Sequence, residues 1–101
     1  MFDVRQTDTF RDWLTSFRDR KAQIRIDARI VHLRNGHFGD ARPVGEGLSE
    51  LRIHHGPGYR LYLVRIGATV VVLLCGGDKS TQDRDIAKAK EIAHSLKEEP
   101  Q

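Results

Sequence analysis

Several side chains suited to phosphodiester chemistry lie in the second half of the chain. A carboxylate or an imidazole can accept the proton of an attacking 2′-hydroxyl, cations can stabilise a phosphorane-like transition state, and a tyrosine can orient or stack on a base. The candidate catalytic residues are Arg60, Lys79, Arg52 and Glu50, and the candidate RNA-binding residues are Tyr62, His54, Arg60 and Lys79. This set has a use in RNA cleavage, provided that the fold brings its members together.

Whether the two arginines share one face of a sheet depends on the register of the hairpin that joins them. A shift of one residue moves a whole set of side chains to the opposite face. A four-residue turn at 55–58 would separate Arg52 from Arg60, whereas a turn of three or five residues or a bulge would bring them together.

No motif in the sequence predicts a metal site or a cofactor site. The segment 76–81, Gly-Gly-Asp-Lys-Ser-Thr, lacks the spacing of a nucleotide-binding P-loop. His32, His37 and His94 are scattered without ligand spacing. The single cysteine, Cys75, ends an apolar run, so we expect a buried, inert thiol rather than a disulfide or a metal ligand.

Apolar periodicity predicts the strands that position these residues. We expect strands at 2–6, 48–54, 59–66 and 69–75, and the continuous Val and Leu run of the last marks it as the most buried. Gly67-Ala68 forms a tight turn, and the stretch 36–47, with its glycines and Pro43, is predicted to be a loop. On the strand 48–54, Glu50, Arg52 and His54 are expected on the exposed side.

Two amphipathic helices are predicted near the ends of the chain. The first carries a core stripe at i, i+3, i+4 and i+7, and Thr9, Thr7 or Asp8 can cap it. Thr81 or Asp83 can cap the last, and residues 98–101 should fray. Their apolar stripes are Phe10, Trp13, Leu14 and Phe17 in the first helix and Ile86, Ala89, Ala93 and Leu96 in the last.

The segment 21–35 alternates like a strand at 24–30, but its length and the Asn35-Gly36 end favour a helix. Its apolar residues would form two opposed stripes, one against the first helix and the other against the sheet. These stripes are Ala22, Ile26, Ile30 and Leu33 on one side and Ile24, Ala28 and Val31 on the other.

Together these elements predict one α+β domain over residues 1–101. The order is strand, helix, helix, three strands and a helix, which gives a mostly antiparallel four-stranded sheet with helices packed on one face. A chain of 101 residues with 39% hydrophobic and 31% charged residues supports one modest core and no second domain.

The charge balance favours particular classes of binding partner. The net charge is +3, and twelve arginines outnumber five lysines, which favours RNA, DNA or an acidic protein. No apolar stretch approaches the roughly 20 residues of a membrane span, and the first residues do not read as a signal peptide. We therefore expect a cytoplasmic protein with no membrane partner.

The motifs Gly-Pro-Gly-Tyr-Arg at 56–60 and Cys-Gly-Gly-Asp-Lys-Ser-Thr-Gln at 75–82, with the apolar strand between them, resemble the RelE/ParE toxins of bacterial toxin-antitoxin modules. The chain looks most like the HigB-like group, the probable addiction module killer proteins, over nearly its whole length. The resemblance implies a compact RelE-like fold and a toxin that a cognate antitoxin neutralises.

Relatives of the RelE and HigB type are ribosome-dependent mRNA endoribonucleases that leave a 2′,3′-cyclic phosphate. Their basic strand residues match Arg52 and Arg60, and a basic residue after their last strand matches Lys79. The implied partners are the ribosome, mRNA and an antitoxin, expected to be a small helix-turn-helix protein. Asp85-Ile86-Ala87 stands where several relatives have a C-terminal Tyr or His, so the resemblance assigns no general acid.

The resemblance leaves two further functions open. The ParE branch of the same superfamily inhibits DNA gyrase by binding, without cleavage. A relative that has lost activity would survive only as an antitoxin-binding protein.

Overall fold

The computed structural model describes residues 1–98. The elements in chain order are β1 (Asp3–Gln6), α1 (Asp8–Thr15), α2 (Arg20–Arg34), β2 (Ala41–Gly45), β3 (Leu48–Ile53), β4 (Tyr59–Ile66), β5 (Val70–Asp78), the short 3-10 helix η1 (Lys79–Thr81) and α3 (Gln82–Glu98). The predicted frayed end, 98–101, lies outside the described residues except for Glu98, where α3 ends. No helix among the described residues is long and apolar enough to span a membrane.

The α+β class is confirmed, but the sheet has five strands rather than four. Their order is β1-β5-β4-β3-β2, with β1 parallel to β5 and every other pair antiparallel. The additional strand, β2, lies in the stretch predicted to be a loop. Its Pro43 is tolerated because β2 is an edge strand with a register shift after Pro43.

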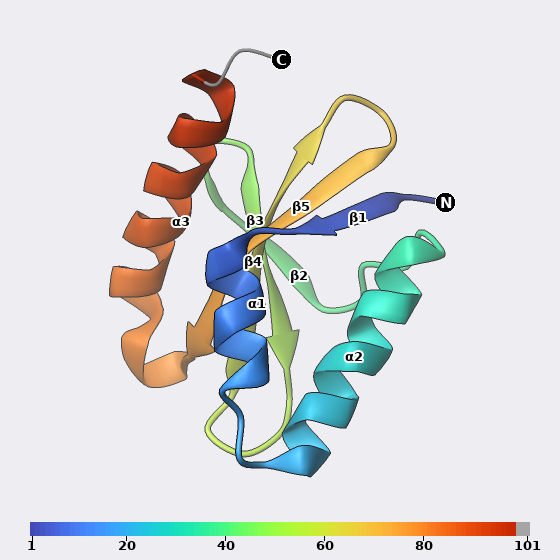
Figure 1. The fold of residues 1–101 in the computed structure, drawn as a ribbon, viewed down its shortest axis with the longest axis vertical. Coiled ribbons are helices and arrows are strands. Elements are labelled where there is room, and N and C mark those ends of the chain that lie inside the picture. The colour runs from blue at the N-terminus through green and yellow to red at the C-terminus, as the bar shows by residue number, and fades with distance from the viewer. Residues whose placement is uncertain (99–101) are drawn as a thin grey trace.

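Helices cover both faces of the sheet, so the predicted packing on one face was wrong. Phe10 of α1 and Ile26 of α2 pack in one core cluster, and Ala89 and Ala93 of α3 pack in a second cluster. In Figure 1, α3 lies at the left, α2 at the right, and α1 in front between them. The central strands are apolar on both sides, as in Leu73 and Leu74 of β5, and both sides must therefore be covered.

The helix starts differ in detail from the predictions. Thr7, one of the three predicted candidates, caps α1 by accepting a hydrogen bond from the amide of Phe10 at 3.0 Å. The chain enters α3, which begins at Gln82 directly after Thr81, through η1, and Asp78 caps η1. The reason is that β5 continues through Gly76 and Gly77 to Asp78, three residues past its predicted end at Cys75.

The segment 21–35 is a helix, as predicted, but it is not sandwiched between two layers. Its first stripe is buried, whereas Ile24, Ala28 and Val31 are exposed. Since α1 and α2 share one face of the sheet, α1 lies beside α2 rather than on top of it.

Candidate functional site

The hairpin between β3 and β4 brings the two candidate arginines together. Ile53 lies opposite Tyr59, so the loop holds five residues, and Arg52 lies opposite Arg60. Glu50 lies opposite Tyr62 on the same face of the sheet. The five-residue alternative is therefore the one that the chain adopts, and it places the cations in one row.

Glu50 is the centre of a buried polar network. The residue is 1% exposed, and its Oε1 accepts a hydrogen bond from Nε of Arg52 at 2.9 Å and lies 4.0 Å from Nε of Arg60. Its Oε2 accepts a hydrogen bond from the side-chain amide of Gln82 at 2.8 Å. The prediction of an exposed Glu50 was wrong, because the first turn of α3 covers this face. A carboxylate held in this way orients cations and is poorly placed to take a proton from a substrate.

Arg60 is nearly buried yet incompletely bonded. Its side chain is 8% exposed, and among the described residues its buried Nε has no hydrogen-bond partner and its Nη1 makes one long hydrogen bond, 3.4 Å, to the carbonyl of Tyr59. Arg52 is more open, with 23% of its side chain exposed. The pair therefore retains hydrogen-bonding capacity that an anion at this rim could use.

Lys79 lies at the same rim as Arg60. A Cβ built on Gly58 would be 3.6 Å from Nη1 of Arg60 and 3.6 Å from Cβ of Lys79, so both residues flank this one position. Gly58 has a φ of +80°, which glycine adopts readily. The base of the Lys79 side chain is thus close to Arg60, and the Lys79 side chain is exposed.

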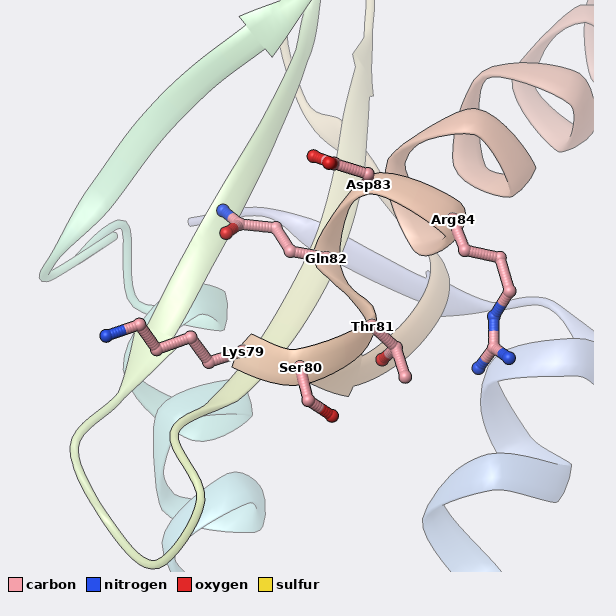
Figure 2. Close-up of a pocket in the computed structure, with 6 residues that line it drawn as sticks. All are labelled: Lys79, Ser80, Thr81, Gln82, Asp83 and Arg84. Carbon is pink, nitrogen blue, oxygen red and sulfur yellow. The ribbon is translucent and has the colours of Figure 1, made fainter.

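The start of α3 forms a hollow beside this rim. Figure 2 shows Lys79 and Gln82 extending to one side, over the β3–β4 hairpin, and Arg84 extending to the other, toward α1. The hollow measures about 400 Å³ and is lined by residues 79–84. Asp78 accepts hydrogen bonds from the hydroxyl and the amide of Ser80, and the hydroxyl bond is the largest cause that holds the pKa of Asp78 below its usual range.

Gly76 and Gly77 allow α1 and α3 to approach the end of β5. A Cβ on Gly77 would fall 1.8 Å from Oδ2 of Asp85, and one on Gly76 would fall 2.4 Å from the ring of Trp13. These glycines are needed for close packing, and no positive φ is involved at either position.

Tyr62 does not reach the rim. Its side chain is fully buried under α3, its hydroxyl has no hydrogen-bond partner among the described residues, and burial raises the pKa of that hydroxyl well above its usual value. The expectation that Tyr62 stacks on a base is therefore not met by this geometry.

His54 is separated from the Glu50 network, because the chain leaves the strand after Ile53. Its Nε2 lies 2.6 Å from a carboxylate oxygen of Asp40, and this hydrogen bond is the main cause that holds the pKa of Asp40 below its usual range. The exposed ring lies beside α2, in a hollow that includes Arg25 and Ala28.

Gln82 is the member of the network that sequence reasoning missed. It ends the Gly-Gly-Asp-Lys-Ser-Thr-Gln motif, but only the folding of α3 over β3 brings it to Glu50. Cys75 is buried as predicted, and burial raises the pKa of its thiol to about 12. Within residues 1–98 no group of three or more His, Cys, Asp or Glu side chains could hold a metal ion.

Comparison with known proteins identifies one relative over nearly the full length. The chain is 48% identical over 93 residues to an uncharacterized protein of Haemophilus influenzae. The aligned region covers 92% of this chain and 94% of that protein. The chain belongs to the family of that protein. No family model matches the sequence. Since both chains are covered almost completely, the family relationship extends over the whole domain.

Proposed function

We propose that this protein is the toxin of a type II toxin-antitoxin module, a HigB-like member of the RelE/ParE superfamily. In this proposal it is a ribosome-dependent mRNA endoribonuclease that arrests translation in the cytoplasm. The observation that carries the proposal is the convergence of Arg52, Arg60 and Lys79 at one end of the sheet, around the buried carboxylate of Glu50.

The element order supports a RelE-like domain. The described residues contain strand, helix, helix, three strands and helix in the expected sequence, with β2 added at the edge. The Gly-Pro-Gly-Tyr-Arg motif ends at Arg60, and the second motif contains Lys79 and Gln82. Both motifs thus contribute residues to the same rim, and this shared site explains why one chain contains both.

The proposed chemistry is attack of a 2′-oxygen on the adjacent phosphorus. A bond forms between phosphorus and the 2′-oxygen as the 2′-hydroxyl gives its proton to water. The bond to the 5′-oxygen breaks as that oxygen takes a proton from water, which yields a 2′,3′-cyclic phosphate and a 5′-hydroxyl. Lys79 and the two arginines would neutralise the negative charge that grows on the phosphoryl oxygens. Glu50 and Gln82 are assigned as positioning residues, since both oxygens of Glu50 are already engaged.

The test is Arg60→Ala, expressed briefly in cells, with growth and the 5′ ends of cellular mRNA as readouts. Growth arrest and mRNA cutting should both be lost, while the circular dichroism spectrum stays that of the folded wild type. Arg11→Ala controls for the loss of one positive charge, because Arg11 is an exposed arginine on α1 outside the Glu50 network. Retained toxicity in the Arg60 variant would count decisively against the proposal.

The same experiment tests the ParE-like alternative. If induction of the wild type leaves mRNA 5′ ends unchanged and triggers DNA-damage signalling, the protein is a gyrase inhibitor instead. The proposed neutralising partner is the product of a neighbouring small gene, expected to encode a helix-turn-helix protein.

A further inference from the structure

The outer surface of α2 carries an apolar row that the described chain leaves exposed. Ile24 and Val31 are 63% and 48% exposed, and they are two of the four large apolar side chains exposed among the described residues. With Ala28 they recur at i, i+4 and i+7, so they form one row along the helix. The row that packs in the core lies on the opposite side of α2, and the exposed row therefore has no role in that core.

Cations border this row on both sides. At about 100° per residue, Lys21 and Arg25 fall on one side of the row and Arg20 and Arg34 fall on the other. All four are exposed, and none forms an ion pair among the described residues. We call these four cations and the row of Ile24, Ala28 and Val31 the α2 outer face. Asp27, the one acidic residue of α2, falls between Arg20 and Arg34 on their side of the row, so the cations outnumber it four to one.

One edge of the α2 outer face opens into a hollow of about 250 Å³ between the helix and the end of β3. Of its lining groups, Arg29 donates to the backbone carbonyls of Arg52 and Phe38, and His54 is paired with Asp40. Arg25 and His32 also line the hollow, and neither side chain has a hydrogen-bond partner among the described residues. The hollow is thus suited to an acidic side chain.

We propose that the α2 outer face docks an acidic amphipathic helix of the neutralising antitoxin. The apolar row of that helix would cover Ile24, Ala28 and Val31, and its carboxylates would pair with the cations on either side. The choice of partner rests on the proposed function. A nucleic acid would use the cations but leave Ile24 and Val31 in water, and a second copy of this chain would bring like charges together.

The binding test uses the purified chain and the purified product of the neighbouring small gene, with the dissociation constant measured by calorimetry. The double variant Ile24→Asp/Val31→Asp should raise the dissociation constant by about 100-fold or more. Lys21→Glu/Arg25→Glu should raise it by roughly 10-fold, with a weaker salt dependence than the wild type. Ile66→Asp is the matched control and should stay within about threefold, because Ile66 is 42% exposed at the end of β4, outside this face.

The proposal is overturned if the wild type does not bind that protein, or if the double variant binds it as tightly as the wild type does. It is equally overturned if Ile24→Asp/Val31→Asp keeps its affinity for that protein and instead loses binding to phosphatidylserine vesicles. The same holds if the double variant instead loses self-association, measured by analytical ultracentrifugation. A growth assay separates this proposal from the proposed function. Expressed alone, the double variant should still arrest growth, since Arg52, Arg60 and Lys79 are intact, and co-expression of the partner should rescue the wild type but not the variant. A wild type that leaves growth unaffected would refute the toxin function, whereas the calorimetry would still decide the docking surface.

Discussion

At the scale of single residues, the candidate site depends on one buried carboxylate. Glu50 uses one oxygen for Arg52 and Arg60 and the other for Gln82. Burial of a charge is costly unless the charge is paired, so each member of this network requires the others. The guanidinium groups are thereby held toward the rim instead of being free to move in solvent.

Replacing Glu50 should therefore lower stability and activity together. We expect Glu50→Gln to reduce the free energy of unfolding by about 2–4 kcal/mol, because two arginines lose their counter-charge in a nearly buried site. Urea denaturation followed by circular dichroism measures this change. Glu46→Gln is the matched control, since Glu46 pairs with Lys90 and His94 near the surface, and it should change stability by less than about 0.5 kcal/mol. An unfolding energy of Glu50→Gln equal to that of the wild type would contradict the network.

Replacing Tyr62 should raise the free energy of unfolding instead of lowering it. Its hydroxyl is buried and has no hydrogen-bond partner within residues 1–98, so its removal takes away an uncompensated desolvation cost. Tyr62→Phe should raise the free energy of unfolding by roughly 0.5–1 kcal/mol and leave growth arrest intact. Tyr59→Phe, at a half-buried ring that packs on Phe17, should be close to neutral. Loss of toxicity in Tyr62→Phe would restore the role in RNA binding that the sequence predicted.

At the scale of elements, the contact that matters is the one between the end of β5 and the first turn of α3. Asp78 caps η1, Thr81 donates to Asp85, and Gln82 reaches across to Glu50. The first turn of α3 thus holds the network in place. Gly77 permits this contact, because its missing side chain leaves room for Asp85.

A methyl group at position 77 should displace that turn. Gly77→Ala would set a Cβ 1.8 Å from Oδ2 of Asp85, so the buried carboxylate of Asp85 would have to move and would lose its hydrogen bond from Thr81. We expect a loss of about 2–3 kcal/mol in the free energy of unfolding, measured by urea denaturation, and a fall in mRNA cutting. Ser49→Ala, at a half-buried position of β3, is the control and should cost far less. A Gly77→Ala variant with wild-type stability would show that α3 does not depend on this close approach.

At the scale of the whole molecule, the net charge of +3 is less informative than its distribution. One group of cations lies at the rim formed by β3, β4 and η1, and another borders the apolar row of α2. We infer that the first meets phosphates and the second meets a protein. The two surfaces should therefore respond differently to salt and to mutation.

Binding of a short single-stranded RNA should show this difference. The slope of log affinity against log salt should be about −0.7 for each phosphate neutralised, so Lys79→Ala should reduce its magnitude by about 0.7. Fluorescence anisotropy at several salt concentrations measures this slope. Lys88→Ala, at an exposed lysine of α3 that lines the hollow beside Trp13, is the control and should leave the slope unchanged. Equal slopes for the wild type and Lys79→Ala would place the RNA elsewhere.

Much of the fold could be predicted from local pattern. Short-range periodicity, which the sequence displays directly, predicts the apolar stripe of Phe10 and Leu14, the helix at 21–35 and the Val and Leu run of β5. Edge strand β2 could not be predicted in this way. Its glycine and proline content is typical of a loop, and only hydrogen bonding to β3 makes the segment a strand. The exposure of Ile24 and Val31 also escaped prediction, since two apolar stripes on one helix do not reveal how many neighbours that helix has.

The same division holds for the candidate site. Residue types and the two glycine-containing motifs, read from the sequence alone, marked Arg52, Arg60 and Lys79 as the cations of interest. Only the tertiary structure decided that a five-residue loop aligns Arg52 with Arg60, that Glu50 and Tyr62 are buried, and that Gln82 joins the network. The physical reason is that side-chain chemistry is a local property, whereas register and burial depend on which distant segments, α3 above all, pack over a given face.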